Sequence, residues 1–73
     1  MQSVRRKPGD PAVRALDQAF REVAAAIAAL VEARGRLLES DPPVEAVLTY
    51  LELASRHVRR ASELCRALKA PRQ

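Results

Sequence analysis

The two side chains best suited to chemistry in this 73-residue chain are its one histidine, His57, and its one cysteine, Cys65. A histidine acts as a general base when a nucleophile and an orienting carboxylate lie within hydrogen-bond reach, and Glu22 or Glu63 could supply the carboxylate. No Ser-His-Asp or Cys-His arrangement with supporting sequence surrounds His57. We therefore interpret His57 as a boundary or interface histidine.

Cys65 falls on a predicted buried helix face, where a cysteine commonly serves as a small hydrophobic residue. The alternative is a reactive thiol, because the positive charge of Arg66 beside it would favour the thiolate if the sulfur were exposed. Metal binding by His57 and Cys65 together is not expected. Eight residues of helix place them on partly different faces, and the chain has no further soft ligand.

No other pattern in the sequence predicts catalysis or ligand binding. The only glycines, Gly9 and Gly35, form no phosphate-binding loop, and no pair of carboxylates has a spacing typical of a general acid and base. We predict that the chain is not an enzyme. We also predict no metal, cofactor or small-molecule ligand.

Basic residues form the one pronounced charge cluster. The chain has 13 Lys and Arg against 9 Asp and Glu, a net charge of +4. Such a cluster could bind nucleic acid through phosphate neutralisation, although Phe20 and Tyr50 lie outside it and offer no stacking within it. The predicted patch for nucleic acid or an acidic partner comprises Arg5, Arg6, Lys7, Arg14, Arg56, Arg59, Arg60, Arg66 and Lys69.

A polar segment with two prolines, residues 39–43, separates two runs of helix-forming residues of similar length. Asp10-Pro11 is a helix start, because Asp can cap the free amides and Pro at the first position wastes no donor. Asp41-Pro42 repeats this signal, and Pro71 ends the second run. The pattern predicts an all-α antiparallel two-helix hairpin over 10–70, with helices at about 11–39 and 42–70 and a turn at 40–41. Residues 1–9 are predicted to be a flexible basic arm and 71–73 a C-terminal tail.

Apolar residues in each predicted helix recur at alternating intervals of three and four, as in a heptad seam. A column of alanines at intervals of seven, Ala12 to Ala33, runs beside the first seam and widens the apolar face. A wide face suits a bundle with more than one neighbouring helix. The predicted interaction face comprises Val13, Leu16, Phe20, Val23, Ile27, Leu30, Val44, Val47, Leu51, Val58 and Leu68.

A chain this short buries only about 60% of the surface that its unfolded form exposes, so a hairpin alone would be marginally stable. The lone cysteine rules out a disulfide within the chain. We therefore predict that the hairpin completes a four-helix bundle, either by homodimerisation or by docking on a larger helical protein. The predicted function is a protein–protein interaction module, such as a small accessory, adaptor or chaperone-like subunit. The alternatives are a small nucleic-acid-associated protein and, less favoured, a regulatory subunit of a larger enzyme.

Charge is distributed unequally along the predicted hairpin. The open end, residues 1–24 and 55–73, has 11 Lys and Arg against 4 Asp and Glu, a net charge of +7. The turn end, residues 25–54, has 2 against 5, a net charge of −3. Two hairpins stacked head to tail would bring each basic end near an acidic turn, which favours one register over others.

The sequence contains no run of about 18 apolar residues, so we predict no membrane partner. Its basic start has no apolar segment behind it and does not resemble a secretory signal. A cytoplasmic location is the expectation, and a lone free thiol fits it.

Overall fold

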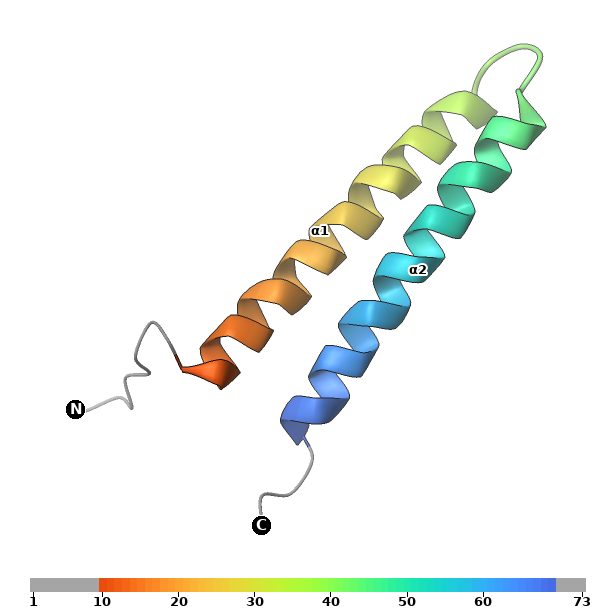
Figure 1. The fold of residues 1–73 in the computed structure, drawn as a ribbon. Helices are drawn as coiled ribbons and strands as arrows, with labels where there is room; N and C mark the ends of the chain where they lie inside the picture. The colour runs from red at the N-terminus through yellow and green to blue at the C-terminus, as the bar shows by residue number, and fades with distance from the viewer. Residues whose placement is uncertain (1–9, 70–73) are drawn as a thin grey trace.

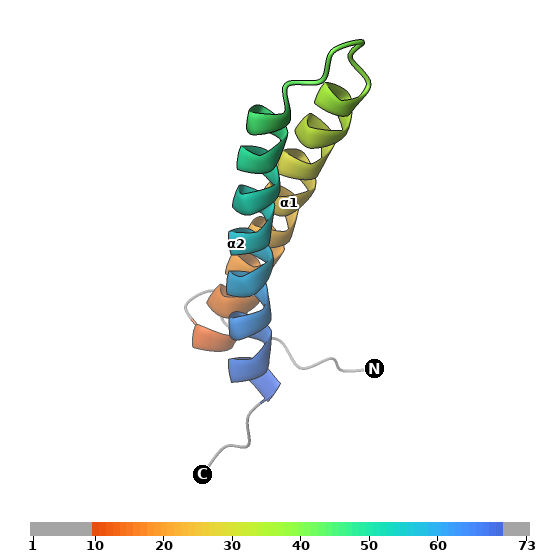
Figure 2. The same ribbon diagram turned by 90° about the vertical axis from the view of Figure 1, so that its right-hand side faces the viewer.

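Two long antiparallel helices make up the fold (Figure 1). The computed structural model describes residues 10–69, and all regular structure within them is helical. Helix α1 spans Pro11–Leu37 and helix α2 spans Val44–Lys69. At about 1.5 Å of rise per residue each helix is roughly 40 Å long. In both views the helices run side by side along their length, with the start of α1 and the end of α2 at the same end (Figures 1 and 2). The predicted two-helix hairpin is confirmed.

Helix α1 begins where the Asp-Pro signal predicts. The side chain of Asp10 accepts a hydrogen bond of 2.8 Å from the backbone N–H of Ala12, and Pro11 occupies the first helical position. The backbone carbonyl of Asp10 also accepts from the N–H of Arg14 at 3.0 Å, which closes the first turn. Asp10 thus satisfies two of the amides at the start of the helix.

The connection between the helices is longer than the predicted turn at 40–41. Helix α1 ends at Leu37, where the N–H of Leu38 bonds to the carbonyl of Gly35 in a tightened last turn. Helix α2 begins at Val44, two residues later than predicted, and the carbonyl of Pro43 accepts from Val47 at 3.0 Å. The second proline explains the delay, because a residue that precedes a proline is disfavoured in the helical region, and Pro42 precedes Pro43.

The contact between the helices consists mainly of alanine. On α1 the buried alanines, with half-buried Ala15 and Glu22 between them, again alternate by three and four: Ala12, Ala15, Ala19, Glu22, Ala26, Ala29 and Ala33. The buried residues facing them from α2 are Val47, Ala54 and Ala61. We call this contact the alanine seam. Ala26, Ala29 and Ala54 form one buried cluster within it, with Ala26 only 4% exposed.

Candidate interaction surface

The large apolar side chains of α1 lie outside the alanine seam. Phe20 is 71% exposed and Ile27 is 56% exposed, and the side chains of Leu16, Val23 and Leu30 are exposed as well. These residues belong to the predicted interaction face. The helix turns about 100° per residue, so this second stripe runs alongside the alanines and shares their three-four spacing. Helix α1 therefore directs small residues inward and large ones outward.

Helix α2 has a matching outward stripe. Val44, Leu51, Val58 and Cys65 are spaced by seven residues, and all four are exposed. Residues of both stripes line one groove, which shows that the stripes lie next to each other on the same side of the hairpin. We call the combined surface the outer face. The residues that line the groove are Val23, Ala26, Ile27, Leu30, Val58, Ala61, Ser62 and Cys65.

Three residues of the predicted interaction face occupy different positions from the rest. Val47 is buried and 5% exposed, so it contributes to the contact between the helices and is not available to a partner. Val13 and Leu68 are half-buried near the open end. Cys65 was predicted to lie on a buried face, and this prediction is wrong: its side chain is exposed. The reason is that α2 turns Val47, Ala54 and Ala61 toward α1, which leaves the stripe containing Cys65 facing away.

A polar cluster interrupts the alanine seam. Nδ1 of His57 lies 2.5 Å from Oε1 of Glu22, and the guanidinium of Arg60 donates to Oε2 of Glu22 at 3.3 Å. An ionised carboxylate only accepts hydrogen bonds, so Nδ1 of His57 carries the proton in this contact. The hydrogen bond from His57, assisted by Arg60, lowers the pKa of Glu22. Since Glu22 and His57 are 35 residues apart, their contact joins the two helices directly.

This cluster places the carboxylate of Glu22 beside the imidazole of His57. Within residues 10–69 the hydrogen-bond partner of the imidazole is Glu22, and no hydroxyl or thiol forms a hydrogen bond with it. Cys65 lies eight residues further along α2, on the outer face. The same described range contains no group of three His, Cys, Asp or Glu side chains that could hold a metal ion. The contact can fix the register of the two helices, because a polar pair in an apolar seam is stable only when its partners meet.

Sequence reasoning named Glu22, with Glu63, only as a possible carboxylate for His57, and it did not use the pair to align the helices, although the signal was present. Glu22 occupies the one non-alanine position of the three-four pattern that runs from Ala12 to Ala33. His57 falls three residues after Ala54 and four before Ala61, the corresponding position on α2. Two polar residues, each flanked by alanines at the three-four spacing, would have indicated both the facing surfaces and the register.

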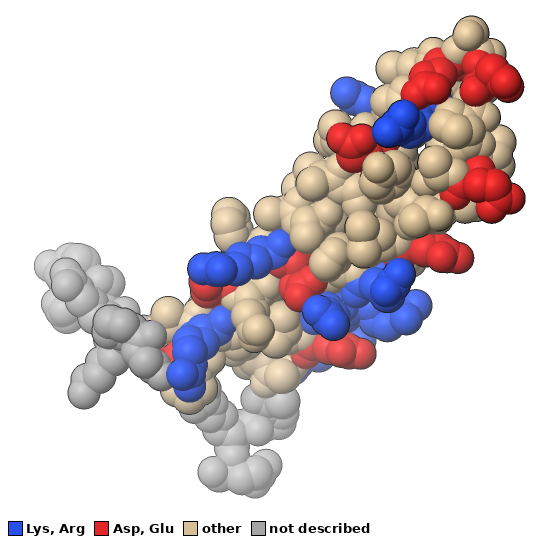
Figure 3. All heavy atoms as spheres, turned by 45° about the horizontal axis from the view of Figure 1, so that its top comes forward, with Lys and Arg blue, Asp and Glu red and all other residues tan. Residues whose placement is uncertain are grey.

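Basic residues gather at the open end of the hairpin but are mixed with acidic ones (Figure 3). Among the described residues of that half, 10–24 and 55–69, there are 7 Lys and Arg against 4 Asp and Glu. Arg21 pairs with Asp17 at 3.0 Å, and Arg60 of the predicted patch is engaged by Glu22. The other described members of that patch are exposed, namely Arg14, Arg56, Arg59, Arg66 and Lys69. Arg5, Arg6 and Lys7, with the predicted arm and tail, lie outside the described residues. Nucleic-acid binding stays a prediction.

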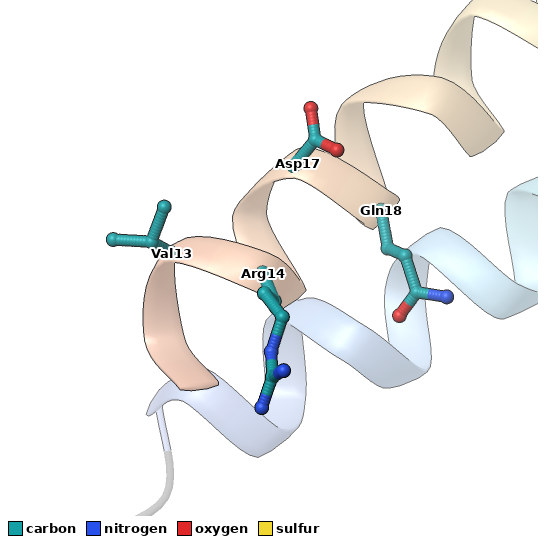
Figure 4. A pocket seen from close by; sticks show the side chains of 4 residues that line it. All are labelled: Val13, Arg14, Asp17 and Gln18. Atoms are coloured by element: carbon teal, nitrogen blue, oxygen red, sulfur yellow. The ribbon is translucent and has the colours of Figure 1, made fainter. Parts of the chain in front are cut away.

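A hollow at the start of α1 is lined by Val13, Arg14, Asp17 and Gln18 (Figure 4). Gln18 also lines a second hollow between the helices, together with Glu22, Arg60, Glu63, Leu64 and Ala67. These hollows contain charged side chains, unlike the groove of the outer face. The hairpin therefore presents a polar side and an apolar side along the seam.

Comparison with known proteins gives no relative for this chain. No protein-family model matches it, and neither a curated protein nor a solved structure is significantly similar. Within residues 10–69 neither helix is long and apolar enough to cross a membrane.

Proposed function

We propose that this chain is a non-catalytic protein–protein interaction module that binds its partner through the outer face. The observation that carries the proposal is the inverted arrangement of side chains. The fully buried residues between the helices are alanines and Val47, whereas Leu16, Phe20, Val23, Ile27 and Leu30 remain exposed. A monomer gains little from large apolar residues that it leaves in water.

The form of the outer face indicates the kind of surface that it fits. Val23, Ile27 and Leu30 of α1 flank a shared groove with Val58 and Cys65 of α2, so the middle of the outer face is a contiguous apolar surface rather than a set of isolated residues. Contiguous apolar surfaces of this kind mark interaction sites on small proteins. Two parallel ridges separated by a groove are complementary to one or two helices, as in the core of a four-helix bundle. A helical partner, either self or foreign, is the proposed ligand.

A pair of neighbouring substitutions tests this proposal. Ile27→Gln places a polar amide in the middle of the outer face, whereas Ala28→Gln places the same amide at an exposed position on a different side of α1. We expect the wild-type chain and Ala28→Gln to associate, either with themselves in light scattering or with a protein captured from the native lysate. Ile27→Gln should associate at least tenfold more weakly.

Both variants should keep the helical content of the wild-type chain by circular dichroism, because neither position belongs to the alanine seam. Equal association by Ile27→Gln and Ala28→Gln would contradict a role for the outer face. A chain that stays a stable monomer at every concentration and captures no partner would contradict the function itself.

A further inference from the structure

Building on the proposed function, we infer that the outer face binds a second copy of this chain, turned end for end, to form an antiparallel four-helix bundle. The twofold axis of this dimer would cross the hairpin near Ala26 and Ala54. Helix α1 would then pack on α1 of the second copy, and α2 on α2. Three observations support this occupant: the position of the stripes, the charge of the two halves and the size of the face.

The two apolar stripes are centred at the same level of the hairpin. The exposed stripe on α1 extends from Leu16 to Leu37, with Arg34 as its one charged position, so its midpoint lies between residues 26 and 27. The stripe on α2 extends from Val44 to Cys65, with its midpoint between residues 54 and 55. Ala26 and Ala54 belong to one buried cluster, so both midpoints lie at the level of their contact. A twofold axis that is perpendicular to the helices at this level places each stripe against the same stripe of the second copy. An isologous interface requires this arrangement.

The charge of the described residues selects the reversed orientation. The open half, residues 10–24 and 55–69, has a net charge of +3. The turn half, residues 25–54, has 2 Lys and Arg against 5 Asp and Glu, a net charge of −3. A copy turned end for end places each basic half over an acidic half. A copy with its ends aligned would place like charges together, which opposes association.

The outer face is large enough for a stable dimer. From Leu16 to Leu37 the stripe is about 31 Å long, and two adjacent helices are roughly 20 Å wide. Such a face covers about 600 Å² on each copy, or about 1,200 Å² in total, which reaches the range of about 1,200–2,000 Å² for stable interfaces. Along α2, Val44 of each copy would lie opposite Cys65 of the other, and Leu51 opposite Val58. Both pairs are symmetric about the midpoint of the stripe.

The single cysteine provides a direct measurement of orientation. Cys65 is exposed in the single hairpin, so a nitroxide label can be attached to it without any substitution, and because it lies at the end of the outer face, light scattering must first show that the labelled chain still dimerises. In the reversed dimer the two labelled residues lie 21 residues of helix apart along the bundle, which is about 31 Å. With aligned ends they lie at the same level, within about 15 Å of each other across a bundle of this width. Double electron–electron resonance on the labelled full chain should therefore give a distance near 31 Å.

A cross-linking experiment provides the independent test. In Val44→Cys the new thiol stands at the other end of the stripe that contains Cys65, too far away for a disulfide within one hairpin. Oxidation should give a covalent dimer in which the thiol introduced at position 44 of each copy is linked to Cys65 of the other, as peptide mapping can identify. Thr49→Cys is the matched control: it adds an exposed thiol to the same half of α2, about 140° away from the stripe. It should remain uncross-linked at protein concentrations where Val44→Cys is converted.

The outcomes separate the dimer from the proposed function. A mass of one chain in light scattering at all concentrations overturns self-association, while the Ile27→Gln comparison still decides whether the face binds another protein. A dimer with labels within about 15 Å overturns the reversed orientation alone. Equal cross-linking of Val44→Cys and Thr49→Cys also contradicts the packing of α2 on α2.

Discussion

Enlarging one alanine in the seam tests whether the small residues hold the helices together. Ala26 is 4% exposed and belongs to the same buried cluster as Ala54, which is 3% exposed. Ala26→Leu adds three carbon atoms within the contact with α2, beside Ala54. Overpacking of this kind costs about 1–3 kcal/mol. At roughly 4–8 °C per kcal/mol for a chain of this size, a loss of about 2 kcal/mol lowers the melting temperature by about 8–16 °C.

The control for this experiment is Ala28→Leu. Ala28 is two residues further along α1 and is exposed, so the same three carbon atoms project into solvent. Ala and Leu are both strong helix formers, and exposed substitutions usually change the unfolding free energy by less than about 0.5 kcal/mol. Thermal unfolding followed by far-UV circular dichroism, at one protein concentration, compares the two variants. If Ala26→Leu melts within about 2 °C of Ala28→Leu, the seam is not closely packed and the assignment of the inner face is refuted.

Substitutions at three further positions test local features of the hairpin. Gly35→Ala should raise the unfolding free energy by about 1 kcal/mol, because a Cβ at this position meets no atom within 4 Å and alanine is the better helix former; an unchanged urea midpoint would contradict this. Asp10→Ala removes the 2.8 Å cap to Ala12 and should cost about 1 kcal/mol in the same assay, whereas Asp10→Asn should retain most of the stability. The pKa of Glu22 is lowered in the folded chain, so its contribution is complete above its ordinary value of 4.5 and is lost as the pH falls through the lower folded value. The melting temperature of the wild-type chain should therefore fall more steeply below pH 4.5 than that of Glu22→Gln, and parallel curves would show that the Glu22–His57 contact does not stabilise the fold.

The sequence was sufficient to predict the two helices, their antiparallel arrangement and the cap at Asp10, because each rests on local chemistry. Helix formers fill both runs, and the Asp-Pro pair and the proline-rich break act within a few residues of themselves. The start of α2 was predicted two residues too early, since the constraint of Pro43 on Pro42 was not applied there. Local signals thus account for the fold except at the turn.

Assignment of the inner face could not be made on the same basis. On α1 the stripe through Ala26 and the stripe through Ile27 have the same three-four period, so periodicity alone fits either one against α2. The choice depends on how close the helices approach, which is a tertiary property. Alanines permit a close approach, and Glu22 on one helix finds His57 on the other only when the alanine stripes face each other. The same ambiguity on α2 explains the wrong assignment of Cys65 to a buried face. Its stripe also contains Val44, Leu51 and Val58, which are typical core residues.

The arrangement of small and large residues links the fold to the proposed association. If the large stripes had faced each other, one hairpin would have buried Phe20, Ile27 and Leu51 within itself and exposed a surface of alanines to any partner. With the alanines inside, the hairpin closes with little buried volume, and the side chains with the most apolar area remain for a second interface. The polar pair of Glu22 and His57 keeps this arrangement in register, because sliding one helix by a turn would leave both groups without their partner inside the seam. The contact between the helices thereby aligns the midpoints of the two outer stripes near Ala26 and Ala54. The reversed dimer depends on this alignment, because its twofold axis passes through that point.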